Sequence, residues 1–217
     1  MPASLTARQT ELRNLFSAVH ASNDATDDHL LDTALGLERE RVENGLSLGK
    51  LLVAHGNHRM EMGDVPYSLI RDLYRALDLP AETLLVDLGS GYGRVGFYGA
   101  ILWEQPVHGI EIVPERVREA QRVRQNLGLS SLHFQMDNML TCTWPEASHY
   151  VLMNSVLPSL MPGLMHRLAE IAQRRKIVVA SVSTANTALQ EQSWLREYIP
   201  ELPSAEPPAN LRIFKSG

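Results

Sequence analysis

The sequence of 217 residues contains a single cysteine, Cys142. One cysteine excludes an internal disulfide and any metal site built from several cysteines. It also fits a reducing compartment, so we expect a cytoplasmic protein. Cys142 lies in a Thr-Cys-Thr stretch, where we expect an inert side chain and not a nucleophile.

Long apolar runs and long basic runs are both missing. No uninterrupted apolar stretch has the length of a membrane span, and the polar segment from Met1 to Glu11 lacks the apolar centre of a signal peptide. No run of five lysines or arginines occurs, and the formal net charge is −5. We therefore expect no membrane partner, and we rank nucleic acid last among acceptors.

What is present is organised around the stretch 83–96. Leu84 to Leu88 form a short apolar run around one acid, which is typical of a strand buried on both faces of a parallel sheet. Gly89, Gly91 and Gly93 then allow a tight turn, and a helix is predicted over 94–103. Such a turn presents backbone N–H groups and a helix N-terminus to a ligand.

The acid in this strand, Asp87, indicates which ligand fits. The residues from Gly91 to Gly96 match the dinucleotide pattern G-x-G-x-x-G, but the match begins two residues after the strand ends. A carboxylate also disfavours an approaching pyrophosphate and favours a cation. S-adenosylmethionine carries an ammonium and a sulfonium, so we predict it as the cofactor and keep an NAD(P)-dependent oxidoreductase as an alternative.

Polar residues follow the next predicted strands at their carboxyl ends, where doubly wound sheets bind ligands. Glu111 ends a strand over 107–111 and is predicted to accept hydrogen bonds from the ribose. Asp137 follows a strand over 132–136 and is predicted to bind adenine, while Asn154 follows a strand over 149–153. The predicted cofactor-binding residues are Asp87, Gly89, Ser90, Gly91, Gly93, Glu111, Ile112, Asp137, Asn138, Met139 and Asn154.

The first part of the chain is predicted to be helical. We expect an α-helical N-terminal cap over 1–65 and a cofactor-binding domain over 66–217. One cap helix is predicted from Thr26 to Gly45, with a solvated charged end. The loop 55–64 is predicted to lie near the cofactor as a lid and not to bind metal, because loop spacing fixes no facing. Four arginines of the later helix 114–127 are expected on its exposed side: Arg116, Arg118, Arg122 and Arg124.

The run Asp87-Leu88-Gly89-Ser90-Gly91-Tyr92-Gly93 closely resembles the first motif of class I S-adenosylmethionine-dependent methyltransferases. With Glu111, Asp137, Trp144 and Asn154, the stretch 67–182 resembles the disruptor-of-telomeric-silencing histone lysine methyltransferases. That family has Asn-Asn-Phe at the end of the fourth strand and an aromatic residue after the adenine-site aspartate. Here Asn154-Ser155-Val156 and Asn138 stand in those places, so the cofactor frame is kept and the lysine channel is not.

The resemblance implies an α/β fold, with a Rossmann-like, mostly parallel sheet of seven strands. The expected reaction is displacement of the methyl group by a nucleophile, assisted by alignment of the reactants. Asn154 and Tyr67 are predicted near the transferred methyl. We favour a protein amine as acceptor. A small-molecule N- or O-methyltransferase and a non-catalytic cofactor-binding protein remain as alternatives, and the sequence leaves the oligomeric state open.

Overall fold

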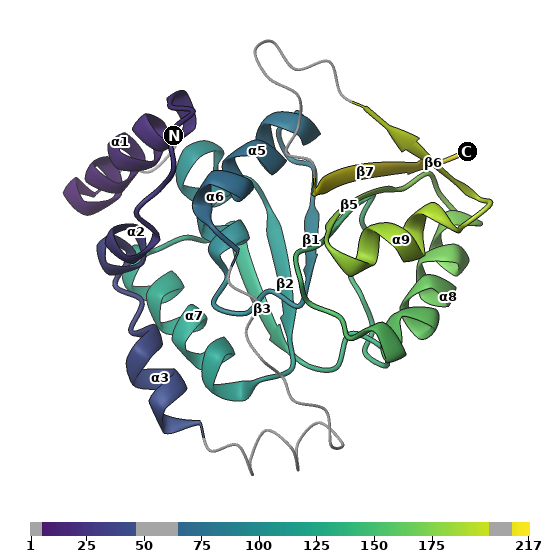
Figure 1. Cartoon of the computed structure of the whole chain (residues 1–217). Helices are drawn as coiled ribbons and strands as arrows, with labels where there is room; N and C mark the ends of the chain where they lie inside the picture. Colours follow the sequence, from purple (N-terminus) through teal and green to yellow (C-terminus); the bar gives the residue numbers. More distant parts are fainter. Residues whose placement is uncertain (1–5, 47–64, 200–209) are drawn as a thin grey trace.

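The computed structural model describes residues 6–46, 65–199 and 210–217. In this part of the chain, seven strands form one sheet in the order β3-β2-β1-β4-β5-β7-β6 (Figure 1). The strands are β1 (Leu85–Leu88), β2 (Val107–Glu111), β3 (Leu132–Met136), β4 (His149–Leu152), β5 (Val178–Val182), β6 (Leu195–Tyr198) and β7 (Leu211–Ser216).

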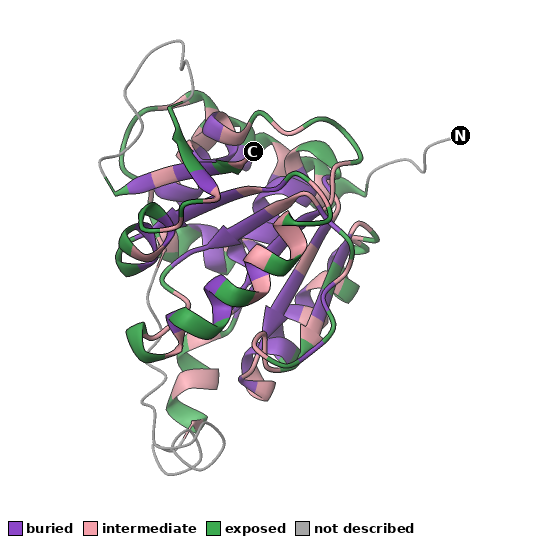
Figure 2. Ribbon diagram, turned by 90° about the vertical axis from the view of Figure 1, so that its right-hand side faces the viewer, coloured by how far each residue is buried: buried purple, intermediate pink, exposed green. Residues whose placement is uncertain are grey.

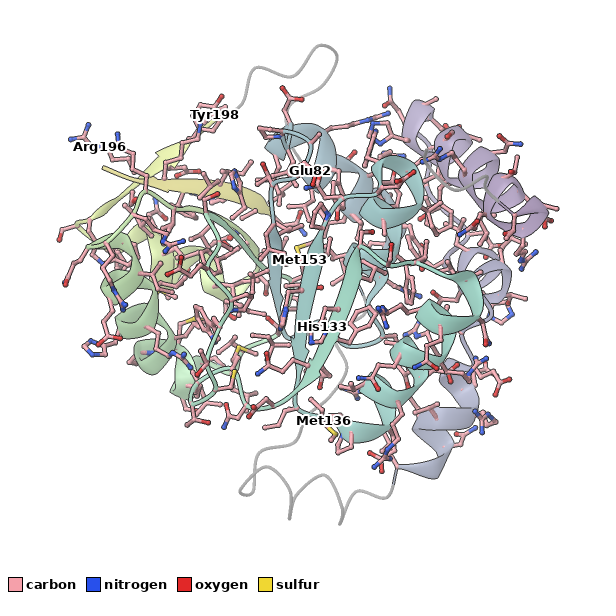
Figure 3. All side chains as sticks on the ribbon, turned by 180° about the vertical axis from the view of Figure 1, so that it is seen from behind. Glu82, His133, Met136, Met153, Arg196 and Tyr198 are labelled. Carbon is pink, nitrogen blue, oxygen red and sulfur yellow. The ribbon has the colours of Figure 1, made fainter. Side chains whose placement is uncertain are left out.

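The sheet confirms the predicted mostly parallel, Rossmann-like arrangement. β1 to β5 pair in parallel, and β7 runs antiparallel between β5 and β6. β1 lies between β2 and β4, and Asp87 is in register with Gly109 on one side and Val151 on the other. The carboxyl ends of the parallel strands therefore meet at one edge, which Met136 at the end of β3 marks in Figure 3.

Helices cover both faces of the sheet because the central strands are apolar on both faces. All four residues of β1 are buried, and Figure 2 shows the buried residues concentrated in the strands. α5, α6 and α7 pack on one face, and α8 and α9 on the other (Figure 1). Their bounds are α5 (Tyr67–Leu77), α6 (Arg94–Trp103), α7 (Pro114–Leu127), α8 (Met161–Ala172) and α9 (Thr184–Gln190).

The N-terminal cap consists, in the described residues, of α1 (Ala7–Ala21), α2 (Asp28–Leu35) and α3 (Arg39–Gly45). The prediction of one helix from Thr26 to Gly45 is wrong, because Gly36 takes φ +83° and separates α2 from α3. The cap shares one core with the sheet domain, in which Phe16 packs edge-on against Tyr98 of α6. The boundary after residue 65 stays a prediction, and the loop 55–64 lies outside the described residues. No helix of the described residues is long and apolar enough to cross a membrane.

A buried ion pair attaches the cap to the sheet domain. Asp32 of α2 is 4 % exposed, and its Oδ1 accepts hydrogen bonds from Arg94 Nε at 3.0 Å and from the Tyr67 hydroxyl at 3.0 Å. Its Oδ2 accepts from Arg39 Nη1 at 2.7 Å and from Arg94 Nη2. Arg94 is the first residue of α6, directly after the glycine turn. Asp32 therefore joins α2, α3, α5 and α6 at one point.

Two charged segments that we expected to be solvated are partly buried. Arg116 of α7 is 4 % exposed and forms an ion pair with Glu43 of α3, with Nε 2.8 Å from Oε1. Arg122 pairs with the buried Glu119, whose carboxylate also accepts from the Glu38 backbone N–H at 2.7 Å. The predicted exposed arginine side of this helix is therefore wrong at Arg116, because the sequence gives no sign that α3 covers it.

We expect Asp32→Asn to lower the free energy of unfolding by about 3–5 kcal/mol, because it leaves buried guanidinium groups without their carboxylate. Urea denaturation measures this change. The control is Glu11→Gln, which removes one partner of the exposed Arg8–Glu11 pair and is expected to cost less than about 1 kcal/mol. Equal, small effects of the two substitutions would contradict the anchoring role of Asp32.

Candidate functional site

The turn after β1 depends on glycines because neighbouring side chains approach its backbone closely. Gly89 has φ +88°, and a Cβ placed on it would lie 2.2 Å from Ser155 Cβ. Gly93 has φ +81°, and a Cβ there would lie 2.4 Å from Phe134 Cζ of β3. The missing side chains therefore let β3 and the segment after β4 close around the turn.

Glu111, the last residue of β2, braces this turn. It is 6 % exposed, and its Oε2 accepts a hydrogen bond from the Gly91 backbone N–H at 2.9 Å. Its Oε1 accepts from the Val113 backbone N–H at 2.8 Å. These bonds fix the carboxylate at the carboxyl edge of the sheet. Each carboxylate oxygen can accept more than one bond, so Glu111 retains capacity for a ligand hydroxyl.

Asp87 lies beside Glu111 inside the sheet and is 2 % exposed. Burial, and next the charge of Glu111, raise the pKa of Asp87 to about 7. Among the described residues, no partner hydrogen-bonds its Oδ1. A buried carboxylate oxygen without a donor is costly unless a ligand supplies one, so this atom fits a cationic group of a ligand.

A cavity opens over the turn. It is open to solvent and small, with a volume of about 60 Å³. Asp87, Gly89 and Gly91 line it from the turn, and Met153 lines it from the end of β4. Arg39 of α3 also lines it, together with Arg94. The structure therefore brings together the turn and the acid that the sequence predicts, and it adds two basic residues bound to Asp32.

The predicted adenine-site residues lie at the end of β3. Asp137 is exposed, and its Oδ1 accepts from the Asn138 backbone N–H at 2.8 Å. Asn138 is partly buried, and its Oδ1 accepts from the Leu140 backbone N–H at 2.9 Å. Met139 reaches the turn, where its Cε would lie 3.3 Å from a Cβ on Gly89. Ile112, next to Glu111, is partly buried, and a polar edge with apolar neighbours of this kind suits a nucleobase.

The two residues predicted near the transferred methyl have different surroundings. Asn154 is exposed just beyond β4, with φ +56°. Tyr67 is fully buried, donates its hydroxyl proton to Asp32 and packs edge-on against Phe16. Tyr67 is not among the residues that line the cavity over the turn, and its place near the transferred methyl stays a prediction. A position at the start of an amphipathic helix is equally typical of a contact with the cap. The sequence alone does not distinguish such a contact from a place near the transferred methyl.

Sequence reasoning missed several residues at the site, Arg94 among them. Ser155 packs over Gly89, and Met153 and Arg39 line the cavity. Arg39 belongs to a charged run that is typical of a solvated helix end, so its sequence context gives no signal. Ser155 and Met153 flank Asn154, and only the predicted strand end draws attention to them.

The described residues contain no group of three or more histidine, cysteine, aspartate or glutamate side chains placed to hold a metal ion. Cys142 is buried, and burial raises the pKa of its thiol. These findings concern the described ranges, and the histidines of the loop 55–64 are not among them.

No protein-family model matches the sequence. A curated relative, 23S rRNA (uracil(747)-C(5))-methyltransferase RlmC of Cronobacter sakazakii, is 32% identical over 130 residues. The match covers 59% of this chain but only 33% of the relative, so the chain corresponds to about a third of that protein.

Two solved structures share the architecture. An RNA methyltransferase from Salinibacter ruber in complex with S-adenosyl-L-homocysteine is 20% identical, with a TM-score of 0.54; the match covers 71% of this chain and 92% of that one. TrmN from Thermus thermophilus is 16% identical, with a TM-score of 0.51, and the match covers 71% and 50%. The chain thus has the fold of the class I S-adenosylmethionine-dependent methyltransferases.

Proposed function

We propose that the protein is an S-adenosylmethionine-dependent methyltransferase. The observation that carries this proposal is the buried Asp87 carboxylate, which lines the cavity over the glycine turn with an oxygen that no described residue hydrogen-bonds. Such an oxygen suits the ammonium group of the cofactor. The relative and the two solved structures, which share this fold, support the same activity.

Different residues at the carboxyl edge of the sheet bind different parts of the cofactor. Glu111 accepts the ribose hydroxyls while it braces Gly91. Asp137 and Asn138 bind the adenine edge, and Met139 covers the ring. The bound cofactor supplies a methyl group on a positively charged sulfur. The chain holds the acceptor in line with that group, which accounts for much of the rate without a strong base.

The two alternatives to an enzyme of this class have less support. A dinucleotide would bring a pyrophosphate to the turn beside Asp87, and a carboxylate at that point repels it. A non-catalytic binding protein would need a closed acceptor side, yet Asn154 is exposed just beyond β4. Calorimetric titration with NAD, S-adenosylmethionine and S-adenosylhomocysteine separates the first alternative from our proposal, and a turnover assay separates the second.

The expectation that ranked nucleic acid last among acceptors is overturned by the similarity to an rRNA methyltransferase. Net charge was a poor guide because it sums the whole chain, whereas an acceptor contacts one face. The preference for a protein amine finds no support in the comparisons, and we abandon it. We propose RNA as the acceptor.

The acceptor atom differs, in our proposal, from the pyrimidine C5 named for the relative. Attack by a ring carbon of this kind needs a nucleophile to activate the ring, and a thiolate is the usual choice in proteins. The one cysteine of the sequence is buried, with a raised pKa. A base nitrogen needs no such step, and the Asn154 carbonyl oxygen can orient it by accepting its N–H.

Transfer of a tritiated methyl group from S-adenosylmethionine tests this function. The protein is incubated with RNA, protein and small-metabolite fractions of a cell extract, and we expect label in the RNA fraction. Label confined to protein or metabolites would overturn the RNA acceptor but not the methyltransferase activity. Absence of both cofactor binding and labelling would overturn the activity itself.

Glu111→Ala is expected to weaken S-adenosylhomocysteine binding by about one to two decades, because loss of a charged acceptor costs roughly 1.5–3 kcal/mol. Isothermal calorimetry measures the affinity. Glu115→Ala is the matched control, since Glu115 lies in the first turn of α7 and pairs with Arg118 at the surface. Unchanged affinity in Glu111→Ala would exclude the ribose assignment.

The pKa of Asp87, raised to about 7, predicts a pH dependence of cofactor affinity. Below pH 7 the carboxyl is protonated and cannot pair with a cation, so S-adenosylmethionine should bind about tenfold more weakly at pH 6 than at pH 8. Through the same group, the free protein loses stability as the pH rises from about 4 to about 7, because the folded state holds the proton more tightly. Asp87→Asn should abolish the dependence of affinity on pH; a variant that retains it would assign the effect to another group.

A further inference from the structure

Two side chains, one in the glycine turn and one directly after it, line the cavity and also form hydrogen bonds to the cap. Tyr92 lies inside the turn and donates its hydroxyl proton to Glu43 Oε1 of α3 at 2.7 Å. Arg94 follows the turn directly and is bound by Asp32 of α2. Both side chains are buried or nearly so, at 3 % and 9 % exposed. The segment proposed to bind the cofactor is therefore tied to the cap through the side chains of Tyr92 and Arg94.

Glu43 stays ionised in this arrangement. Its own burial acts to raise its pKa, but hydrogen bonds from Arg116 and Tyr92 lower the pKa of Glu43 below its usual value. Arg116 contacts Glu43 through Nε at 2.8 Å and Nη2 at 3.2 Å, which is a two-point ion pair. The hydroxyl of Tyr92 thus meets a fixed, charged acceptor, a stronger partner than a neutral group.

The opposite side of the same turn is held by Glu111, which accepts the N–H of Gly91, the residue just before Tyr92. Glu111 is also the proposed ribose ligand. The turn therefore lies between the carboxylate of Glu111, which is the proposed cofactor ligand, and the carboxylates of Glu43 and Asp32, which belong to the cap. If the hydrogen bonds to the cap shift, Tyr92 moves, and the N–H of the neighbouring Gly91, which Glu111 accepts, moves with it.

We propose that Glu43 and Asp32 are positioning residues for the cofactor. Through Tyr92 and Arg94 they hold the glycine turn in the shape that binds S-adenosylmethionine, although neither is among the residues that line the cavity over the turn. This inference rests on the proposed function. Because coupling between two binding events is reciprocal, the bound cofactor must then stabilise the docking of α2 and α3 on the turn.

The test compares two tyrosines that each donate one hydroxyl proton. Tyr92→Phe removes the bond to Glu43 and keeps the ring, whereas Tyr150→Phe removes a bond to the Ala147 backbone carbonyl at 3.0 Å, away from the turn. We expect Tyr92→Phe to weaken S-adenosylhomocysteine binding about three- to tenfold and Tyr150→Phe to change it less than twofold. Calorimetry gives the affinities, and the thermal midpoints show whether the two variants lose comparable stability.

Hydrogen exchange provides the second measurement. If the contact had only a structural role, ligand binding would not change the exchange of the α3 amides. In the wild-type protein, S-adenosylhomocysteine should slow exchange of the α3 amides, and in Tyr92→Phe this protection should be reduced. Glu43→Gln weakens the same bond from the other side and also breaks the ion pair with Arg116, so it should reduce the protection at least as much as Tyr92→Phe.

The possible failures are distinguishable. If the wild-type protein binds no S-adenosylhomocysteine, the proposed function fails and the coupling fails with it. If the wild-type protein binds and Tyr92→Phe binds equally well, the coupling alone is refuted. Unchanged α3 exchange in the wild-type complex would refute the coupling even if Tyr92→Phe did not fold.

Discussion

One buried carboxylate carries the attachment of the N-terminal helices to the rest of the molecule. Asp32 accepts hydrogen bonds from two arginines and a tyrosine, and these three residues come from three other helices. Removing such a charge pair from water is costly, and only the full set of donors offsets the cost. The arrangement is therefore all-or-none, and the start of α6 is fixed by the same contacts that fix α2.

The parts of the fold that local sequence determines were predicted closely. β2, β3 and α6 have the predicted bounds, because a short apolar run marks each strand and the glycine turn marks the start of the helix. The seven-stranded sheet was expected from the resemblance to class I methyltransferases, and the structure has it. By contrast, the pairs that decide how the cap lies join residues far apart in the chain, such as Asp32 with Arg94 and Glu43 with Arg116. A charged residue in a helix looks the same in sequence whether solvent or another helix covers it.

The same distinction explains the outcome at the site. Asp87 and Glu111 were predicted to bind the cofactor because strand ends converge at one edge of a parallel sheet, which is a property of topology, and their binding roles stay predictions. Tyr67 bonds to Asp32 of the cap, which the sequence does not indicate, because a tyrosine at a helix start gives no sign of where its side chain points. Arg39 and Ser155 were missed because their roles come from approach in space: Ser155 lies over Gly89, where only a glycine leaves room.

The burial of the Asp32 network has a consequence for behaviour in salt solutions. Dissolved ions screen exposed charges over about 10 Å at 0.1 M ionic strength but reach buried pairs far less. Binding of a polyanion such as RNA, in contrast, weakens steeply as salt displaces protein cations from phosphate. Ionic strength thus acts on the two kinds of electrostatic contact separately. At a salt concentration that releases a nucleic acid, the helices around Asp32 stay in place.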